Sequence, residues 1–187
     1  MEVQNKFDGS SYEFTKTKLS KLVLANIEDA EFILSLRENP DLNKFISYVD
    51  SNIEKQTQWL VNYKKRECIR TKFYFIIKDI NNEDLGTVRL YDFQTGSFCW
   101  GSWVVNPNAP RKTAIESALN VYEFAFNVLG FSQSHFDVRN ENLKVIEFHK
   151  RMGAKVIKSD SLDTYFVFEK SAYEITRDTY NQFFHGD

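Results

Sequence analysis

The chain has 187 residues, which is enough for one domain with a sizeable core. It is 42% hydrophobic and 27% charged, as is typical of a globular protein, and its net charge of -2 gives no reason to expect a nucleic acid or acidic membrane as partner. Its two cysteines, Cys68 and Cys99, form no disulfide framework and no zinc site without added His or Asp ligands, so no metal is expected. With no apolar run that could span a membrane and no apolar signal core, the sequence predicts a cytoplasmic protein.

The first elements alternate between strand and helix. Residues 1–17 are polar and mixed, which predicts a loose N-terminal arm, and Lys18–Leu24 is predicted to be a strand. Asn26 is the expected cap of a helix that ends at Asn39-Pro40, because a residue before proline avoids helical geometry.

A second helix is followed by three strands. Ser51 and Glu54 form an S-x-x-E capping box, which predicts a helix through Trp59 to about Arg66. Short polar turns then separate apolar runs at Phe73–Ile77, Leu85–Tyr91 and Phe98–Val105. This arrangement indicates an antiparallel meander.

The second half continues the alternation to the end of the domain. Apolar residues from Ile115 to Leu129 recur at helical spacing and stop at Gly130. The remaining predictions are a strand at His135–Val138, a helix at Asn142–Met152 that Gly153 stops, and strands at Lys155–Ile157 and Thr164–Glu169. Residues 171–187 are a polar-aromatic tail that packs either on the domain or on a partner subunit, which leaves a homodimer open. Together these elements predict one α/β domain over residues 18–170 with a mixed sheet.

The corner VVNPNAPRKTAIESAL, residues 104–119, joins a strand to a helix through a short loop. A helix N-terminus presents unpaired N–H groups and partial positive charge, and here Arg111 and Lys112 lie beside those groups. A pyrophosphate is a natural guest for such a corner, although many helices begin in a similar way.

The order of elements, from about Leu22 to Glu169, resembles the GNAT superfamily of acyl-CoA-dependent N-acetyltransferases. The corner is similar to the family's strand-to-helix motif N-P-x-x-R-G-K-G-x-G-x-x-A-L and agrees with it at Asn106, Pro107, Lys112, Ala118 and Leu119. The segment VRNENLKVIEFHKRMGA resembles a second family motif and agrees with it at Val138, Asn142 and Gly153. The Trp59 helix and the segment Leu36–Asn39 are similar to the branch with ribosomal-protein and amino-sugar acetyltransferases. The resemblance implies a mostly antiparallel sheet with helices on both faces and acetyl-CoA as donor.

Two departures from the family pattern stand at the expected donor site. The family's glycines fall at Thr113 and Ile115, and its Arg or Gln falls at Pro110. If Thr113 and Ile115 keep a negative φ, no glycine is required there. Otherwise CoA binds more weakly, another donor takes its place, or the protein is a non-catalytic relative. The second departure is His149, in the slot of the family's tyrosine acid. Histidine can fill that role, although a structural side chain bonded to backbone or water is an equal alternative.

The resemblance implies how the donor is held. The pantetheine arm is expected between the strands 100–105 and 135–138, where it pairs with backbone and a backbone N–H stabilises the oxyanion. The cofactor-binding residues expected on this basis are Val104, Val105, Arg111, Lys112, Thr113, Ala114, Asn142 and Phe148.

The acceptor side is less well defined by the sequence. Asp92 is the preferred base among four carboxylates near the expected cleft, with Glu83, Asp137 and Glu141, and a water chain without a single base is also compatible. Trp59, Tyr91 and Trp100 are expected to contact the acceptor. The acceptor is predicted to be a small-molecule amine, and the preferred candidate is an amino sugar on a nucleotide carrier. A protein N-terminus is the alternative acceptor, and a CoA-binding relative without turnover is the alternative function.

Overall fold

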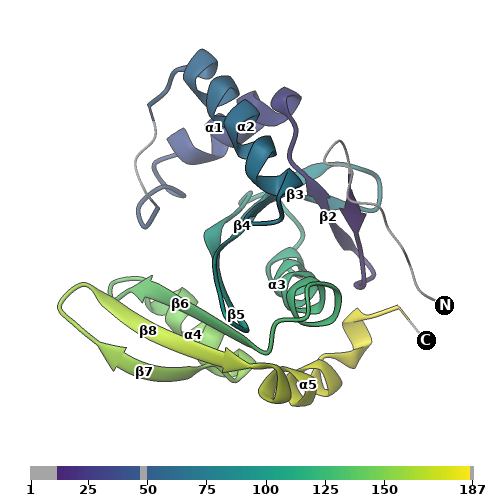
Figure 1. Cartoon of the computed structure of the whole chain (residues 1–187), viewed down its shortest axis with the longest axis vertical. Helices are drawn as coiled ribbons and strands as arrows, with labels where there is room; N and C mark the ends of the chain where they lie inside the picture. Colours follow the sequence, from purple (N-terminus) through teal and green to yellow (C-terminus); the bar gives the residue numbers. More distant parts are fainter. Residues whose placement is uncertain (1–11, 47–49, 186–187) are drawn as a thin grey trace.

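The computed structural model describes residues 12–46 and 50–185 and contains one eight-stranded sheet (Figure 1). Its strand order is β1-β2-β3-β4-β5-β6-β8-β7, and every neighbouring pair is antiparallel except the parallel pair β5–β6. The strands are β1 (Glu13–Phe14), β2 (Ser20–Leu24), β3 (Phe73–Asp79), β4 (Asp84–Gln94), β5 (Ser97–Val105), β6 (Gln133–Arg139), β7 (Lys155–Ser159) and β8 (Asp163–Glu169). The sheet is mixed and mostly antiparallel, which confirms the expected fold class.

The helices are α1 (Ala30–Glu38), α2 (Ile53–Cys68), α3 (Thr113–Glu123), α4 (Leu143–Met152) and α5 (Lys170–Thr179), with a π-helical turn at Phe124–Val128 and short 3-10 turns at Ile27–Asp29 and Asn181–Phe183. The helices α1 to α4 lie between strands in the predicted order, and α5 follows the last strand, where the sequence predicted a tail. In the described part of the chain, no helix has the length and apolar character needed to cross a membrane.

Strand alternation assigns the helices to the two faces of the sheet. On β3, the Phe73 and Phe75 rings lie 5.4 and 5.3 Å from the Phe124 ring, which continues α3. The side chain between them, Tyr74, points the other way and its ring lies 5.7 Å from Tyr63 on α2. Because successive side chains of a strand face opposite sides, α2 and α3 cover opposite faces.

The helices α4 and α5 lie on the same face as α3. On β8, Phe166 contacts His149 of α4, and Phe168 contacts Tyr122 of α3 and Tyr173 of α5, at ring separations of 5.9, 4.8 and 6.2 Å. Phe166 and Phe168 are two residues apart and therefore share a face. We name the two faces after the substrate that the sequence analysis expects on each. The face that carries α1 and α2, with Trp59, is called the acceptor face below, and the face that carries α3, α4 and α5, with the corner before α3, is called the donor face.

Two helix starts differ from the sequence expectation in detail. Asn26 caps a 3-10 turn that leads into α1, and its backbone N–H donates to the Asp29 carboxylate at 2.7 Å. The cap of α2 is Asn52 and not Ser51, because the Asn52 side chain accepts the Lys55 backbone N–H at 2.9 Å. An asparagine oxygen satisfies the third helical amide as well as serine does, so the helix begins one residue later.

The expected loose arm is folded from Tyr12 onwards. β1 pairs with β2 through Phe14 and Leu22, and Tyr12 and Phe14 are buried against Phe124. These aromatic side chains bury enough apolar surface to fix a short edge strand. Residues 1–11 of the predicted arm lie outside the described part.

The predicted tail also packs on the domain, because its residues 171–179 belong to α5. Tyr173 is buried and its hydroxyl donates to the Glu123 carboxylate at 2.8 Å. Arg177 donates to the same carboxylate oxygen at 2.8 Å, so α5 is held to α3 by a buried polar cluster as well as by aromatic contacts.

Asn120 of α3 fixes the start of β2 through buried hydrogen bonds. Its side-chain amide donates to the Thr17 hydroxyl and to the Ser20 carbonyl at 2.8 and 2.9 Å, and its oxygen accepts the Lys16 backbone N–H at 2.9 Å. Removal of the amide takes away the acceptor of the Lys16 and Thr17 backbone N–H groups, whereas the Thr17 hydroxyl and the Ser20 carbonyl keep their hydrogen bond to each other at 3.1 Å.

We expect Asn120→Leu to lower the free energy of unfolding by about 3 kcal/mol, because each buried polar group left unpaired costs about 1–3 kcal/mol. Urea denaturation followed by circular dichroism measures the change. The control is Asn62→Leu at an exposed position of α2, which should stay within about 0.5 kcal/mol of the parent. Equal effects of the two substitutions would contradict the prediction.

Candidate active site

The strands β5 and β6 separate soon after they meet. In the described residues their pairing is confined to Ser97–Phe98 of β5 against Gln133–Ser134 of β6. On its other edge β5 has a bulge, since Thr87 of β4 pairs with Val104 while Arg89 pairs with Gly101. The bulge contains Ser102 at φ 46°, a left-handed backbone conformation that residues other than glycine rarely adopt. Bulges of this kind re-aim backbone groups next to active sites.

A cleft of about 590 Å³ opens where the two strands diverge. Its walls come from both faces of the sheet, because the neighbouring residues Phe136 and Asp137 of β6 point to opposite sides. Phe136, Val145 and His149 line it on the donor face, and Tyr91 and Asp137 line it on the acceptor face. A ligand that fills the cleft therefore reaches both faces, which suits a reaction between two substrates that enter from opposite sides.

His149 is the polar group of the donor wall. Its imidazole is buried among aromatic rings, with the Phe136 ring at 4.4 Å and the Trp100 ring at 5.4 Å. Its Nδ1 has no hydrogen-bond partner within the described part of the chain. Burial lowers the pKa of His149 to about 3, so the ring is neutral at physiological pH. A buried unpaired nitrogen at a cleft wall is a group that a bound molecule can satisfy.

The corner before α3 carries the expected basic side chains without glycine. Thr113 and Ile115 have negative φ, since positive φ outside glycine occurs in the described residues at Arg70, Asn82, Asp92 and Ser102. The loop therefore needs no glycine dihedrals. Arg111 and Lys112 are exposed, and Lys112 Nζ lies 5.5 Å from the centre of the Phe183 ring.

The backbone N–H of Thr113 is not available to a ligand in this conformation. Its side chain is buried, and its backbone N–H donates to the Pro110 carbonyl at 2.9 Å. Ala114 is half-buried in the first turn of the helix. The anion-binding capacity of this corner therefore rests on Arg111, Lys112 and the remaining first-turn amides.

Two other expected donor residues, Val104 and Val105, lie just beyond the cleft and are paired with β4. Gly101, Ser102 and Trp103 of the β5 bulge line the cleft instead, and the sequence did not predict them. The bulge shifts the open backbone of β5 toward its N-terminal side, a shift that sequence spacing does not reveal.

Asn142 and Phe148 lie at and beside the cleft. Asn142 lines the cleft at the start of α4, and its backbone N–H donates to the Arg139 carbonyl at 2.8 Å. The Phe148 ring packs against Trp103 at 5.1 Å and so supports the bulge. Trp100 also lines the cleft. Its indole is held in place from the buried side, where its Nε1–H donates to the Tyr122 hydroxyl at 3.1 Å.

The four candidate bases occupy different places. Asp137 and Glu141 line the cleft. Partial burial raises the pKa of Asp137, and the nearby Asp163 carboxylate raises it further. Glu83 is in the turn before β4, where its N–H donates to Asp79 at 2.8 Å.

Asp92, the preferred base, is not brought to the cleft. It is exposed at the end of β4 with φ 48°, and its carboxylate accepts from Gln94 and His135, both at 3.0 Å. The β4–β5 register shifts between Tyr91 and Gln94, so Asp92 lies in an irregular end of the strand, and Tyr91 lines the cleft while Asp92 does not. The hydrogen bonds from His135 and Gln94 lower the pKa of Asp92, as is usual for a structural carboxylate.

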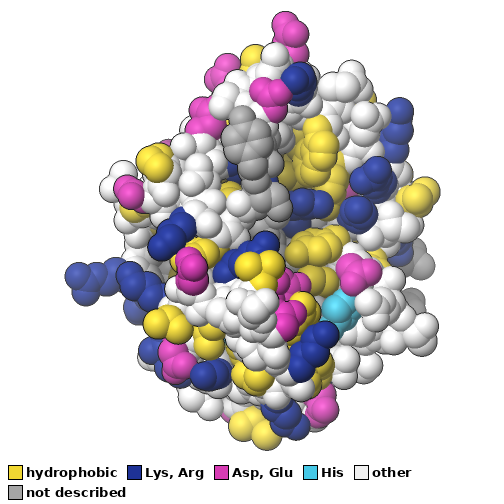
Figure 2. Space-filling view, turned by 90° about the vertical axis from the view of Figure 1, so that its left-hand side faces the viewer, with side chains coloured by type: hydrophobic (Ala, Val, Ile, Leu, Met, Phe, Trp, Pro, Cys, Tyr) yellow, Lys and Arg dark blue, Asp and Glu magenta, His cyan; other side chains and the backbone are white. Residues whose placement is uncertain are grey.

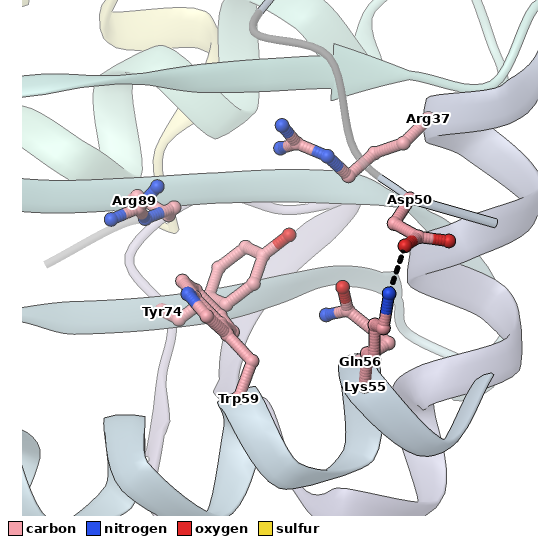
Figure 3. A pocket seen from close by; sticks show the side chains of 7 residues that line it. All are labelled: Arg37, Asp50, Lys55, Gln56, Trp59, Tyr74 and Arg89. Carbon is pink, nitrogen blue, oxygen red and sulfur yellow. Dashed lines mark hydrogen bonds and ion pairs between the residues drawn. The ribbon is translucent and has the colours of Figure 1, made fainter. Parts of the chain in front are cut away.

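A second cavity of about 310 Å³ lies on the acceptor face, between α1, α2 and strands β3 and β4 (Figure 3). We call it the basic aromatic cavity, and its lining residues are Arg37, Asp50, Lys55, Gln56, Trp59, Tyr74 and Arg89. Trp59 is therefore at a cavity wall, as expected, but not at the cleft wall. Figure 2 shows hydrophobic and cationic side chains gathered together on this side of the molecule.

Comparisons with known proteins agree with this architecture. The sequence matches the family described as acetyltransferase (GNAT) domain over residues 21–155. A solved structure described as apo FdhC, a nucleotide-linked sugar GNAT, is 44% identical, with a TM-score of 0.85 and coverage of 92% of this chain and 98% of that chain. The chain therefore belongs to the GNAT acetyltransferase family, and its acyl donor is acetyl-CoA.

More distant structures share the fold. Spermidine N-acetyltransferase from Vibrio cholerae, in complex with CoA and spermine, is 16% identical with a TM-score of 0.71 and covers 83% of this chain and 98% of its own. A GCN5-related N-acetyltransferase from Brucella melitensis is also 16% identical, with a TM-score of 0.75 and coverage of 91% and 84%. A comparison with curated protein sequences gives no significant match.

Proposed function

We propose that the protein transfers an acetyl group from acetyl-CoA to the amino group of a nucleotide-linked amino sugar. The observation that carries the proposal is the arrangement of two neighbouring cavities along β4. Arg89 lines the basic aromatic cavity, Tyr91 lines the cleft, and the Arg89 guanidinium lies 5.3 Å from the Tyr91 ring. An acceptor with a small amine at one end and a flat, anionic group at the other fits this arrangement. The likeness to FdhC, a nucleotide-linked sugar GNAT, supports the same class of acceptor.

In this proposal, residues on the two faces of the sheet carry out different parts of the reaction. Acetyl-CoA supplies a thioester, whose carbon–sulfur bond breaks as the carbon–nitrogen bond to the acceptor amine forms. Asp137 on the acceptor face is our candidate base, because its raised pKa favours proton uptake from an ammonium group. Backbone N–H groups of Gly101–Trp103 are available at the bulge to polarise the acyl oxygen.

His149 acts on the donor face in this proposal. Because its pKa is lowered to about 3, the neutral ring stabilises the departing sulfur through a ring N–H hydrogen bond and not as an imidazolium. Arg111 and Lys112 hold the pyrophosphate of the donor, and Asn142 lies at the cleft where the donor's arm passes. Most of the rate enhancement comes from alignment of the two substrates in one cleft.

Thiol release in the presence of acetyl-CoA tests the proposed acceptor. The panel contains amino sugars linked to nucleoside diphosphates, the corresponding free amino sugars, spermidine and a peptide with a free N-terminus. We expect kcat/KM for a nucleotide-linked amino sugar to exceed that of the free sugar by about 100-fold, because the free sugar lacks the remote binding energy. A preference for the peptide or for spermidine would contradict the proposal.

Substitution of the donor corner provides the control for this assay. Arg111→Gln with Lys112→Gln should raise the KM for acetyl-CoA by about 10-fold, since each lost charge-assisted hydrogen bond weakens phosphate binding. The order of preference among the acceptors should not change, because both side chains lie on the corner before α3 and line neither cavity.

A further inference from the structure

The basic aromatic cavity combines an aromatic wall with cationic side chains. The Arg89 guanidinium lies over four rings, 5.2 Å from both Trp59 and Tyr63, 5.8 Å from Tyr74 and 5.3 Å from Tyr91. These contacts hold the guanidinium in one place at the cavity wall, where its Nε–H donates to the Tyr63 hydroxyl at 3.5 Å. Trp59 keeps 37% of its surface exposed, which is unusual for so large an apolar side chain.

The charges around the cavity favour an anion. Among the described lining residues, the three cationic side chains Arg37, Lys55 and Arg89 face one carboxylate, Asp50, which is paired with Lys55. Burial lowers the pKa of Arg37, and the nearby Arg89 lowers it further, while the Tyr74 hydroxyl acts in the opposite direction. Two guanidinium groups close enough to repel each other are stabilised by a ligand with at least two negative charges.

Gln56 adds a polar group at the floor of the cavity. Gln56 is 6% exposed, and in Figure 3 its amide lies on the cavity side of α2 next to the Lys55 side chain. An amide both donates and accepts, as the edges of nucleobases do. An aromatic face, a neighbouring amide and a pair of guanidinium groups together match the parts of a nucleoside diphosphate.

We infer that the basic aromatic cavity holds the nucleoside diphosphate part of the acceptor, with the base stacked on Trp59 and the diphosphate bound by Arg37 and Arg89. The assignment to the acceptor rests on the proposed function. The Arg89–Tyr91 contact then marks the passage from the diphosphate to the sugar, whose amine lies in the cleft next to Asp137.

Calorimetric titration with UDP, dTDP, GDP and ADP tests the inference without turnover. The protein is saturated with acetyl-CoA beforehand, so that no nucleotide can enter the donor site. We expect one of the nucleotides to bind, and Trp59→Ala and Arg37→Gln each to weaken its binding by about 10-fold or more. Pyrophosphate alone should be sensitive to Arg37→Gln and insensitive to Trp59→Ala, because it has no base to stack.

The matched control is Arg66→Gln, which removes the same charge from an exposed position of α2 outside both cavities. It should leave nucleotide binding within twofold of the parent. Gln56→Leu is a second cavity variant of similar shape, and circular dichroism verifies that each variant is folded.

The outcomes separate the inference from the proposed function. The inference is overturned if no nucleotide binds at about 5 mM, or if neither Trp59→Ala nor Arg37→Gln changes the affinity for nucleotide. This holds even when nucleotide-linked amino sugars are acetylated. If a nucleotide binds through these residues but no nucleotide-linked amino sugar is acetylated, the assignment to an acceptor is overturned. Binding through Trp59 and Arg37 together with acetylation supports both.

Discussion

Replacement of Asp137 by asparagine should lower kcat by about 10²–10⁴-fold, with the dissociation constant for acetyl-CoA changed less than twofold. Positioned general bases contribute factors of this size. Asp137 lines the cleft from the acceptor face, beside Tyr91, whereas the donor corner lies at the start of α3. Asparagine keeps the shape of the side chain and removes its ability to accept a proton, so substrate positioning should survive.

The pH profile identifies the base more specifically than the loss of rate. The pKa of Asp137 is raised, by burial first and by Asp163 second, and the protonated form cannot act as a base. Activity of the parent should therefore fall as pH decreases through this raised pKa. The acidic limb of kcat/KM against pH should disappear in Asp137→Asn, whose residual activity has no carboxylate to titrate at this position.

Two further substitutions make this result interpretable. Glu147→Gln removes an exposed carboxylate on α4 that is paired with Lys150, and it should leave kcat unchanged. Asp92→Asn tests the base that the sequence favoured. A larger loss of kcat for Asp92→Asn than for Asp137→Asn would refute our assignment and restore Asp92.

Asp92 and Asp137 show which part of the site the sequence could not predict. The order of strands and helices could be predicted because apolar periodicity reports which side chains are buried. The choice between Asp92 and Asp137 depends on a register shift in β4 after Tyr91, and composition carries no signal for a bulge. In the same way, the bulge in β5 moves the cleft lining from Val104 and Val105 to Gly101–Trp103.

Apart from Trp59, the residues of the basic aromatic cavity were not predicted from the sequence, for a different reason. Arg37 is on α1 and Arg89 is on β4, so their proximity arises from tertiary packing and not from spacing along the chain. Trp59 was predicted because aromatic faces stack on sugars and nucleobases and because its helix is similar to one branch of the family. α5 was missed because its inward residues, Tyr173 and Thr176, are polar, and their partners lie on α3 and at the end of α4.

Replacement of His149 by phenylalanine should make the protein more stable and the enzyme slower. The Nδ1 atom is buried without a partner in the described residues, and such an atom costs about 1–3 kcal/mol of folding free energy. Phenylalanine removes the polar atom and fills a site already surrounded by Trp100, Phe136 and Phe166. Urea denaturation at pH 7.5 should show a gain of about 1–2 kcal/mol.

The pH dependence of stability provides an independent measurement. The native pKa of His149 is about 3, against 6.5 for an exposed histidine, so below pH 6.5 the unfolded chain binds a proton that the native ring does not. This group therefore lowers stability by about 1.4 kcal/mol per pH unit as pH falls from 6.5 toward 3. Between pH 7.5 and 5.0 the parent should lose about 2 kcal/mol more than His149→Phe. Equal losses would mean that the ring is already paired or accessible in the native state.

Activity decides whether the unpaired nitrogen has a function. If His149 stabilises the departing sulfur, His149→Phe should lower kcat by about 10–100-fold, while acetyl-CoA binding measured by calorimetry changes little. His149→Gln, which keeps a donor in the cleft wall, should recover part of the rate but none of the gain in stability. A variant that is more stable and fully active would assign His149 to packing alone. A gain in stability joined to a loss of kcat would show that the protein keeps a destabilising polar atom because the reaction uses it.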